Sequence, residues 1–265
     1  MNRMDTYKTK GIIIKSRKQG EADRIITLIS PDEGIFDAKI KGAFRMKSKL
    51  NPSCGHFCAV ELTLAKGKVI DTVMESSLIR SSEQLEDDII KVTYASLIAE
   101  VTYKMSGERQ PDTRAYTLLD NALKSMEEGI MPGLVTAAFL IKRLYIDGLL
   151  PTMASCSKCG SKQDLGWFSA ETGGCLCADC AMVAPGVLRM QEPSRELAIE
   201  LYRSTWDEIR TAKYASDILE ELLAALLSFI CFRGDLRLRS AETLDLLKDE
   251  LCIRRDEFEA GKIRD

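Results

Sequence analysis

The sequence predicts an α+β protein in which an N-terminal five-stranded OB-fold barrel precedes an α-helical domain that carries a four-cysteine zinc module. Three observations support this prediction. Short β-branched segments separated by turns fill the first 80 residues, helical patterns begin near residue 82, and two C-x2-C pairs interrupt the helices. Because 265 residues exceed the usual size of one domain, we expect a barrel domain at 1–80 and a helical domain at 81–265, with the module inserted at 152–184.

Five segments of the first domain have the composition of short strands, and turn residues such as Gln19-Gly20 and Pro31-Asp32-Glu33-Gly34 separate them. The expected strands are 11–14, 24–29, 35–40, 60–64 and 69–73. Five short strands favour a small closed barrel, and the OB fold is the common five-stranded case. Periodicity alone does not separate it from an SH3-like barrel.

Beyond residue 82 the pattern becomes helical. The expected helices are 84–104, 113–127, 134–149, 194–202, 215–232 and 241–251. Pro132-Gly133 and Gly148 are the breaker and the stop signal of the third of these helices.

Charge is divided unevenly along the chain. The whole sequence has 37 basic and 40 acidic residues, whereas residues 1–50 have 12 Lys and Arg against 6 Asp and Glu. A polyanion should therefore meet the first domain. No apolar run approaches the about 18 residues that a membrane span needs, and the polar N-terminus is unlike a signal peptide. We therefore expect a cytoplasmic protein without membrane contact, whose thiols are reduced.

The cysteine pairs predict one structural zinc ion held by Cys156, Cys159, Cys177 and Cys180. Seventeen residues separate the two pairs, a spacing typical of four-thiolate zinc sites, and four sulfurs leave no open coordination position. Four unrelated thiols or a redox pair are the alternatives. Cys175 is a competing ligand, but its use would break the C-x2-C spacing. A second metal site around His56 is less favoured, because Cys54 and Cys58 supply too few ligands.

A basic cluster without any acid begins near the end of the third strand and continues beyond it. It consists of Lys39, Lys41, Arg45, Lys47 and Lys49, with Phe36 and Phe44 nearby. OB barrels bind single strands along charged grooves with aromatic side chains as stacking platforms, so we expect DNA to bind here. The alternative is a solvated charged loop.

Several motifs, in this order along the chain, resemble those of the RecO family of bacterial recombination mediators. The N-terminal ones are Thr9-Lys10-Gly11, Gly20-Glu21-Ala22-Asp23-Arg24 and Ile40-Lys41-Gly42-Ala43. The later ones are Gly148-Leu149-Leu150-Pro151, Cys156 and Cys159 followed by Gly160, Phe168, Gly173-Gly174, and the pair Cys177 and Cys180. In zinc-bearing members two apolar residues separate the Gly-Gly pair from the third ligand, which places Cys175 in an apolar position and makes Cys177 the ligand.

The resemblance implies a DNA-repair protein of the gap-filling recombination pathway. Such a protein binds single- and double-stranded DNA and anneals strands coated by single-stranded-DNA-binding protein. With RecR it helps to load the RecA recombinase, and it catalyses no covalent reaction. The acidic, hydrophobic tail of the single-stranded-DNA-binding protein needs cations beside apolar residues. Lys142 and Arg143, amid Phe139, Leu140 and Leu144, are the candidate pocket. The favoured alternative is a core helix with exposed cations.

Two other classes of function compete with this interpretation. A structural zinc adaptor would hold protein partners without binding DNA, and salt-dependent binding of single strands separates the two. An enzyme is disfavoured because the sequence has no P-loop, no G-x-G-x-x-G and no G-x-S-x-G motif.

Overall fold

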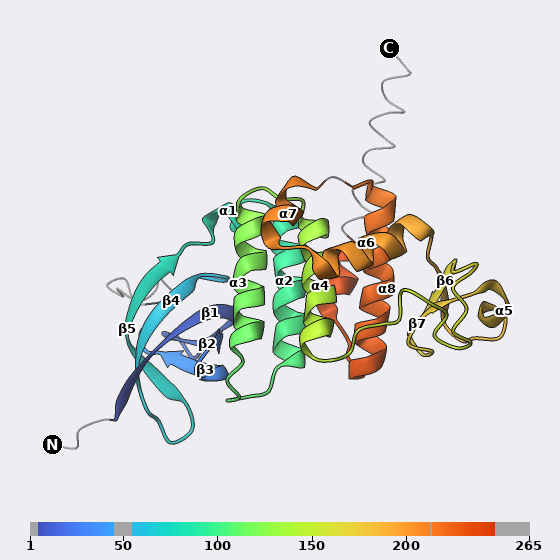
Figure 1. Ribbon diagram of the computed structural model, residues 1–265. Helices are drawn as coiled ribbons and strands as arrows, with labels where there is room; N and C mark the ends of the chain where they lie inside the picture. The colour runs from blue at the N-terminus through green and yellow to red at the C-terminus, as the bar shows by residue number, and fades with distance from the viewer. Residues whose placement is uncertain (1–4, 45–54, 213, 247–265) are drawn as a thin grey trace, which may run out of the picture.

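The computed structural model describes residues 5–44, 55–212 and 214–246. A barrel forms one end of the molecule, a bundle of helices forms the middle, and the small cysteine module lies beyond the bundle, on the side away from the barrel (Figure 1). The order barrel, helices and module is the architecture that the sequence predicts.

The N-terminal strands close into a barrel in the order β1-β2-β3-β5-β4, with β1 also pairing with β4. The strands are β1 (Thr6–Gln19), β2 (Asp23–Ser30), β3 (Gly34–Ile40), β4 (Ala59–Ala65) and β5 (Asp71–Arg80). The pair β3 and β5 is parallel and the other pairs are antiparallel. This order is that of an OB-like barrel, so the predicted fold is confirmed. The strand β1 is much longer than the predicted 11–14, because its polar ends still pair through the backbone with β4 and β2.

The barrel strands contribute to two hydrophobic cores. Ile13, Leu28 and Leu62 lie inside the barrel, whereas Ile12 and Ile14 belong to the core of the helical bundle. Successive side chains of a strand point to opposite faces, so a continuous apolar run buries both faces of β1. The barrel therefore packs directly on the helices through one outer face.

Helices surround one central, almost fully buried helix. The larger helices are α2 (Ile89–Met105), α3 (Thr113–Glu127), α4 (Pro132–Ile146), α6 (Glu192–Arg203) and α8 (Ser216–Gly234). The shorter ones are α1 (Glu83–Glu86), α5 (Ala178–Ala181) and α7 (Trp206–Thr211). The helix α4 contacts α2, α3, α6 and α8, in keeping with its apolar residues on every side. In the described part of the chain, no helix is both long and apolar enough to span a membrane.

The ends of α4 follow the predicted signals. Pro132 occupies the first turn. Gly148 has a φ of 71°, and the N–H of Leu149 donates to the carbonyl of Leu144 at 2.8 Å. This left-handed cap ends the helix before residue 149, where the sequence had predicted its end.

The helix α7 was not predicted, because six residues are too few to show a period. It begins at a capping box formed by Thr205 and Glu208. The predicted helix 241–251 is helical from 239 to 246, and its remainder lies outside the described residues.

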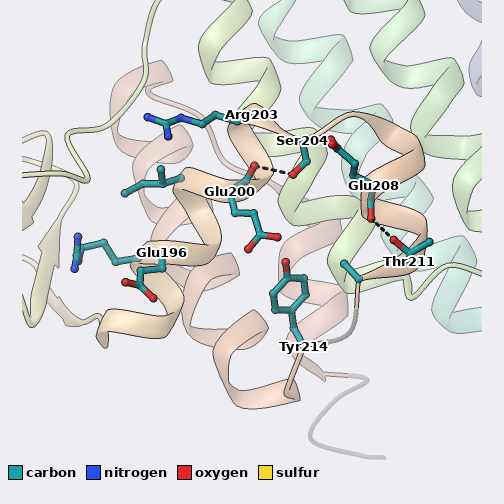
Figure 2. A pocket seen from close by; sticks show the side chains of 10 residues that line it. Glu196, Glu200, Arg203, Ser204, Glu208, Thr211 and Tyr214 are labelled. Carbon is teal, nitrogen blue, oxygen red and sulfur yellow. Dashed lines mark hydrogen bonds between the residues drawn. The ribbon is translucent and has the colours of Figure 1, made fainter.

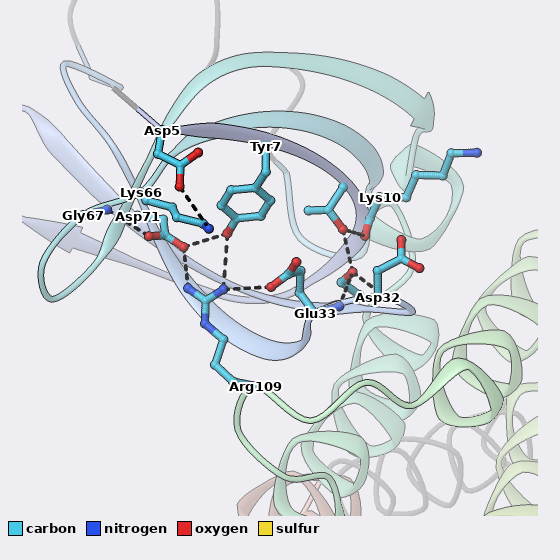
Figure 3. Close-up of polar contacts among 11 residues, drawn as sticks. Asp5, Tyr7, Lys10, Asp32, Glu33, Lys66, Gly67, Asp71 and Arg109 are labelled. Atoms are coloured by element: carbon cyan, nitrogen blue, oxygen red, sulfur yellow. Dashed lines mark hydrogen bonds and ion pairs between the residues drawn. The ribbon is translucent and has the colours of Figure 1, made fainter. Parts of the chain in front are cut away.

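Arg109, in the loop between α2 and α3, ties the bundle to the barrel (Figure 3). Its guanidinium donates to Asp71, to the hydroxyl of Tyr7 at 3.2 Å and to Glu33 at 3.3 Å. Its backbone N–H donates to the carbonyl of Ile35 at 2.8 Å. Gly34 allows this approach, because a Cβ there would lie 2.2 Å from the carbonyl oxygen of Gln110.

Candidate metal centre and nucleic-acid interface

The four cysteines of the two C-x2-C pairs converge on one point. The sulfur atoms of Cys156, Cys159, Cys177 and Cys180 all lie within 4.8 Å of one another. Gly160 follows the first pair with a φ of 77° and donates its N–H to the carbonyl of Cys156 at 2.9 Å, which closes a tight turn. Cys177 immediately precedes α5, and Cys180 lies within that helix. The two pairs therefore face each other across the space that one ion would fill.

The thiol pKa values of the module's cysteines differ, because backbone hydrogen bonds dominate at one position and burial at another. Burial alone would raise the pKa of Cys156, but hydrogen bonds from backbone N–H groups, that of Cys177 foremost, lower it to about 6. Burial raises the pKa of Cys175 to about 11. The Cys175 thiol is fully buried and lies 3.6 Å from the sulfur of Met153 and 3.8 Å from that of Met190. Cys175 therefore points into the protein core, away from the cluster.

The donor set fits a structural metal. Four thiolates at these separations match a tetrahedral site for a soft or borderline cation, with no position left for water or a substrate. The module is β6 (Trp167–Ser169), β7 (Gly174–Leu176) and β8 (Val187–Arg189), together with α5 and the loops between them. Its own hydrophobic core consists of four residues, Cys156, Leu165, Leu176 and Cys177. So small a core includes two of the candidate ligands themselves, and Phe168 and Cys175 of the module belong instead to the core of the bundle.

The basic cluster is only partly described, because Arg45, Lys47 and Lys49 lie outside the described residues. Lys39 forms an ion pair with Asp23 at 2.8 Å, and its side chain is 24% exposed. Lys41 follows the end of β3 in an exposed turn. Lys39 therefore lies on β3 and Lys41 lies in the turn after it, because β3 ends at Ile40. The positive charge of Lys39 is balanced by a carboxylate.

The two aromatic residues near this cluster also differ. Phe36 is 2% exposed, and the guanidinium of Arg109 lies 4.5 Å from the centre of its ring. Phe44 is 43% exposed, with the cations of Lys18 and Arg24 at 5.6 and 5.0 Å from its ring centre. Of the two, Phe44 alone offers a surface for stacking.

The expected partner pocket at Lys142 and Arg143 needs a correction. Arg143 is 1% exposed, donating to Asp147 at 2.8 Å and to the carbonyl of Met105 at 2.8 Å. It is a buried structural residue, because its side of α4 faces the interior of the bundle. Phe139, Leu140 and Leu144 are buried as well. Lys142 instead borders a pocket of about 440 Å³ whose other lining residues include Arg114, Leu118, Tyr145, Tyr202 and Trp206.

A larger groove of about 1030 Å³ lies between α6 and α7 (Figure 2). Its lining combines Arg195 and Arg203 with the acids Glu196, Glu200 and Glu208. Burial and a hydrogen bond to Glu200 raise the pKa of Tyr214 to about 12. Three carboxylates make this groove a poor surface for a phosphate backbone or an acidic peptide.

Reasoning from the sequence missed a group of cations on β1 and α2. Lys15 lies over the ring of Tyr103, 3.1 Å from its centre, and Tyr103 is 39% exposed. The signal available in the sequence was the run of Lys15, Arg17 and Lys18 at the end of the first strand. Tyr103 is 88 residues away in the chain, so no local pattern links it to these cations.

Comparison with known proteins identifies the class of the chain. The family model for the N-terminal part of recombination protein O matches residues 4–82, and that for its C-terminal part matches residues 86–242. An OB-like barrel joined to a helical domain with a four-cysteine module is thus, in this chain, the architecture of a DNA-repair and recombination protein.

Relatives of the same description cover most of the chain. The DNA repair protein RecO of Dehalococcoides mccartyi strain 195 is 31% identical over 238 residues, which is 88% of this chain and 92% of the relative. That of Symbiobacterium thermophilum is 30% identical over 92% of this chain and 99% of the relative, and that of Acetivibrio thermocellus is 33% identical over 83% and 88%. The chain belongs to the RecO family.

Proposed function

We propose that this protein is a recombination mediator that binds single- and double-stranded DNA through its barrel and anneals strands coated by single-stranded-DNA-binding protein. With RecR it assists the loading of RecA at gaps, and it catalyses no covalent step. The observation that carries the proposal is an excess of positive charge on the N-terminal 50 residues of a RecO-family chain whose other 215 residues are acidic. Cations on a barrel neutralise phosphates and release counterions whatever the sequence of the DNA.

The proposed ion is zinc, held by Cys156, Cys159, Cys177 and Cys180. Zinc imposes no geometric preference of its own and is commonly bound by four thiolates in structural sites. When bound, it supplies folding free energy to the module and no catalytic chemistry.

The proposed docking site for the tail of the single-stranded-DNA-binding protein is the pocket beside Lys142. Arg114 and Lys142 supply positive charge, and Leu118 and Trp206 supply apolar surface. The ammonium of Lys142 donates to the carbonyls of Tyr202 and Ser204, which holds it at the pocket. An acidic tail with a hydrophobic end matches this combination.

An annealing assay on complementary strands tests these proposals together. The strands are precoated either with intact single-stranded-DNA-binding protein or with a form that lacks its C-terminal tail. We expect the parent chain to anneal strands coated with the intact protein and to lose most of this activity without the tail. Arg114→Ala combined with Lys142→Ala should imitate the loss of the tail, while annealing of bare strands stays unchanged.

Failure of the parent chain to anneal or to bind bare DNA would contradict the proposed function and favour a structural adaptor. Annealing that is equally fast with and without the tail would contradict the docking site only.

A further inference from the structure

A strip of cations and exposed aromatic rings runs from the β1–β2 hairpin to the C-terminal end of α2. We call it the β1–α2 strip, and it consists of Lys15, Arg17, Lys18, Phe44, Tyr103 and Lys104. Arg17, Tyr103 and Lys104 line a cleft of about 650 Å³ between the barrel and α2. The strip therefore crosses from one domain to the other instead of lying on the barrel alone.

Each exposed ring of the strip has positive charge against it. Lys15 approaches Tyr103, and Lys18 approaches Phe44. Within the described ranges, no carboxylate lies within ion-pair distance of Lys15 or Lys18. A lysine that contacts a ring and has no acid partner keeps its charge available for an incoming anion.

Two of the acids near the strip are already engaged, and a third acid, Glu108, also lines the cleft. Asp37 accepts a hydrogen bond from Thr27 at 2.6 Å and pairs with Arg17 at 3.4 Å. Glu100 accepts the backbone N–H groups of Arg239 and Ser240 and pairs with Lys104 at 3.4 Å. Arg239 adds another exposed cation near Lys15. Lys15, Arg17, Lys18, Lys104 and Arg239 outnumber these three acids, so the strip is positive in sum, although Arg17 and Lys104 each pair with one acid.

We propose that the β1–α2 strip binds single-stranded nucleic acid, with Phe44 and Tyr103 as stacking platforms for bases and the neighbouring cations as phosphate contacts. This proposal rests on the proposed function and names the surface and the form of the DNA. Exposed rings beside cations match the flat base and the anionic phosphate of one nucleotide. A base can reach these rings from a single strand, whereas the bases of a duplex are stacked within it.

The sharpest test separates stacking from charge. Binding of the full chain to a fluorescent oligothymidylate is compared with binding to an abasic phosphodiester of the same length. The variants are Tyr103→Leu and Phe44→Leu, with Tyr103→Phe as the matched control that keeps a ring. Stacking on an aromatic side chain contributes about 1–3 kcal/mol per base, so each Leu variant should bind oligothymidylate roughly 5- to 150-fold more weakly. Affinity for the abasic chain should not change, and Tyr103→Phe should bind like the parent.

A second measurement locates the contact directly. Oligonucleotides that carry 5-iodouracil are bound to the parent chain, and the complex is irradiated. Cross-links should form to peptides that contain Tyr103 and Phe44. Cross-links confined to other peptides would overturn the proposal.

The outcomes distinguish this proposal from the proposed function. If both Leu variants bind oligothymidylate as tightly as the parent does, the β1–α2 strip is not the binding surface. The proposed DNA-binding function would be unaffected by this result. Equal losses on ordinary and abasic chains would also overturn it, because the rings would then act only through packing. Competition by a polyglutamate peptide that weakens with Tyr103→Leu would assign the strip to an acidic protein. A parent chain that binds no DNA would instead contradict the proposed function itself.

Discussion

The barrel and the cysteine module lie at opposite ends of the bundle and are stabilised in different ways (Figure 1). The barrel encloses a hydrophobic core of twelve residues within a closed sheet. The module has a core of four residues, two of which are sulfur ligands. Burial of apolar area can stabilise the barrel, whereas the module has too little of it. The comparison teaches that the barrel is ordered by its own packing, whereas the module has few apolar contacts of its own and four thiols close enough to hold an ion.

Removal of the proposed ion should have the largest effect on stability. It should affect the module and leave the barrel unchanged. We expect Cys156→Ser or treatment with a chelator to unfold the module and to leave the barrel folded, because structural zinc contributes roughly 10–16 kcal/mol in small zinc-finger peptides. Hydrogen exchange should show rapid exchange of β6, β7 and β8 with unchanged protection of β1 to β5. Elemental analysis should find one zinc per parent chain and none in the variant.

Cys175→Ser is the control for this prediction. Its sulfur contacts Met153 and Met190, so the substitution should lower stability but retain the metal. Loss of zinc in this variant would identify Cys175 as a ligand. Equal protection of the module with and without metal would contradict the comparison.

The contact between barrel and bundle should show an effect of intermediate size. Arg109→Ala removes the charge-assisted hydrogen bonds to Asp71 and Glu33. Such bonds contribute about 1.5–3 kcal/mol, so we expect the free energy of unfolding to fall by about 2 kcal/mol in urea denaturation. Arg17→Ala is the control, because its pair with Asp37 is exposed and should contribute less than about 1 kcal/mol. Equal losses in both variants would show that Arg109 does not hold the domains together.

The stabilisation that Arg109 provides through Asp71 should decrease at acidic pH. Burial alone would raise the pKa of Asp71, but hydrogen bonds from Tyr7, Gly67 and Arg109 lower it. A lowered pKa in the folded state means that the stabilisation is complete above the unfolded value, about 3.9, and is lost as pH falls through the folded value. The difference in stability between the parent and Arg109→Ala should therefore be constant near neutral pH and shrink below about pH 4. A difference that stays constant to lower pH would exclude Asp71 as its source.

The sequence predicts local features of this molecule well and long-range ones poorly. The C-x2-C spacing and the caps of α4 depend on neighbouring residues, and both are visible in the sequence. Arg109 reaches Asp71 across 38 residues, and no periodicity indicates such a contact. Arg143 illustrates the opposite error. A cation in an apolar helix suggests an exposed face, but Arg143 is buried, and Asp147 one turn later neutralises its charge.

Substitution of single lysines should have the smallest effects on DNA binding. Lysines of the barrel can be compared here with a lysine of the module at the other end of the molecule. Each phosphate contact that is lost lowers the slope of log K against log salt by roughly 0.7 on single strands. We expect Lys41→Ala to lower the slope by about this amount, because Lys41 is exposed in the turn after β3. Lys39→Ala should lower it less, because Asp23 already balances the charge of Lys39. Lys162→Ala in the module removes an exposed cation from the other end of the chain and should leave the slope unchanged. Lys41→Ala and Lys162→Ala should barely alter stability, since exposed charges contribute little to folding. If Lys162→Ala lowered the slope as much as Lys41→Ala, DNA binding would depend on the net charge of the whole protein. The barrel would then not be the preferred DNA-binding surface.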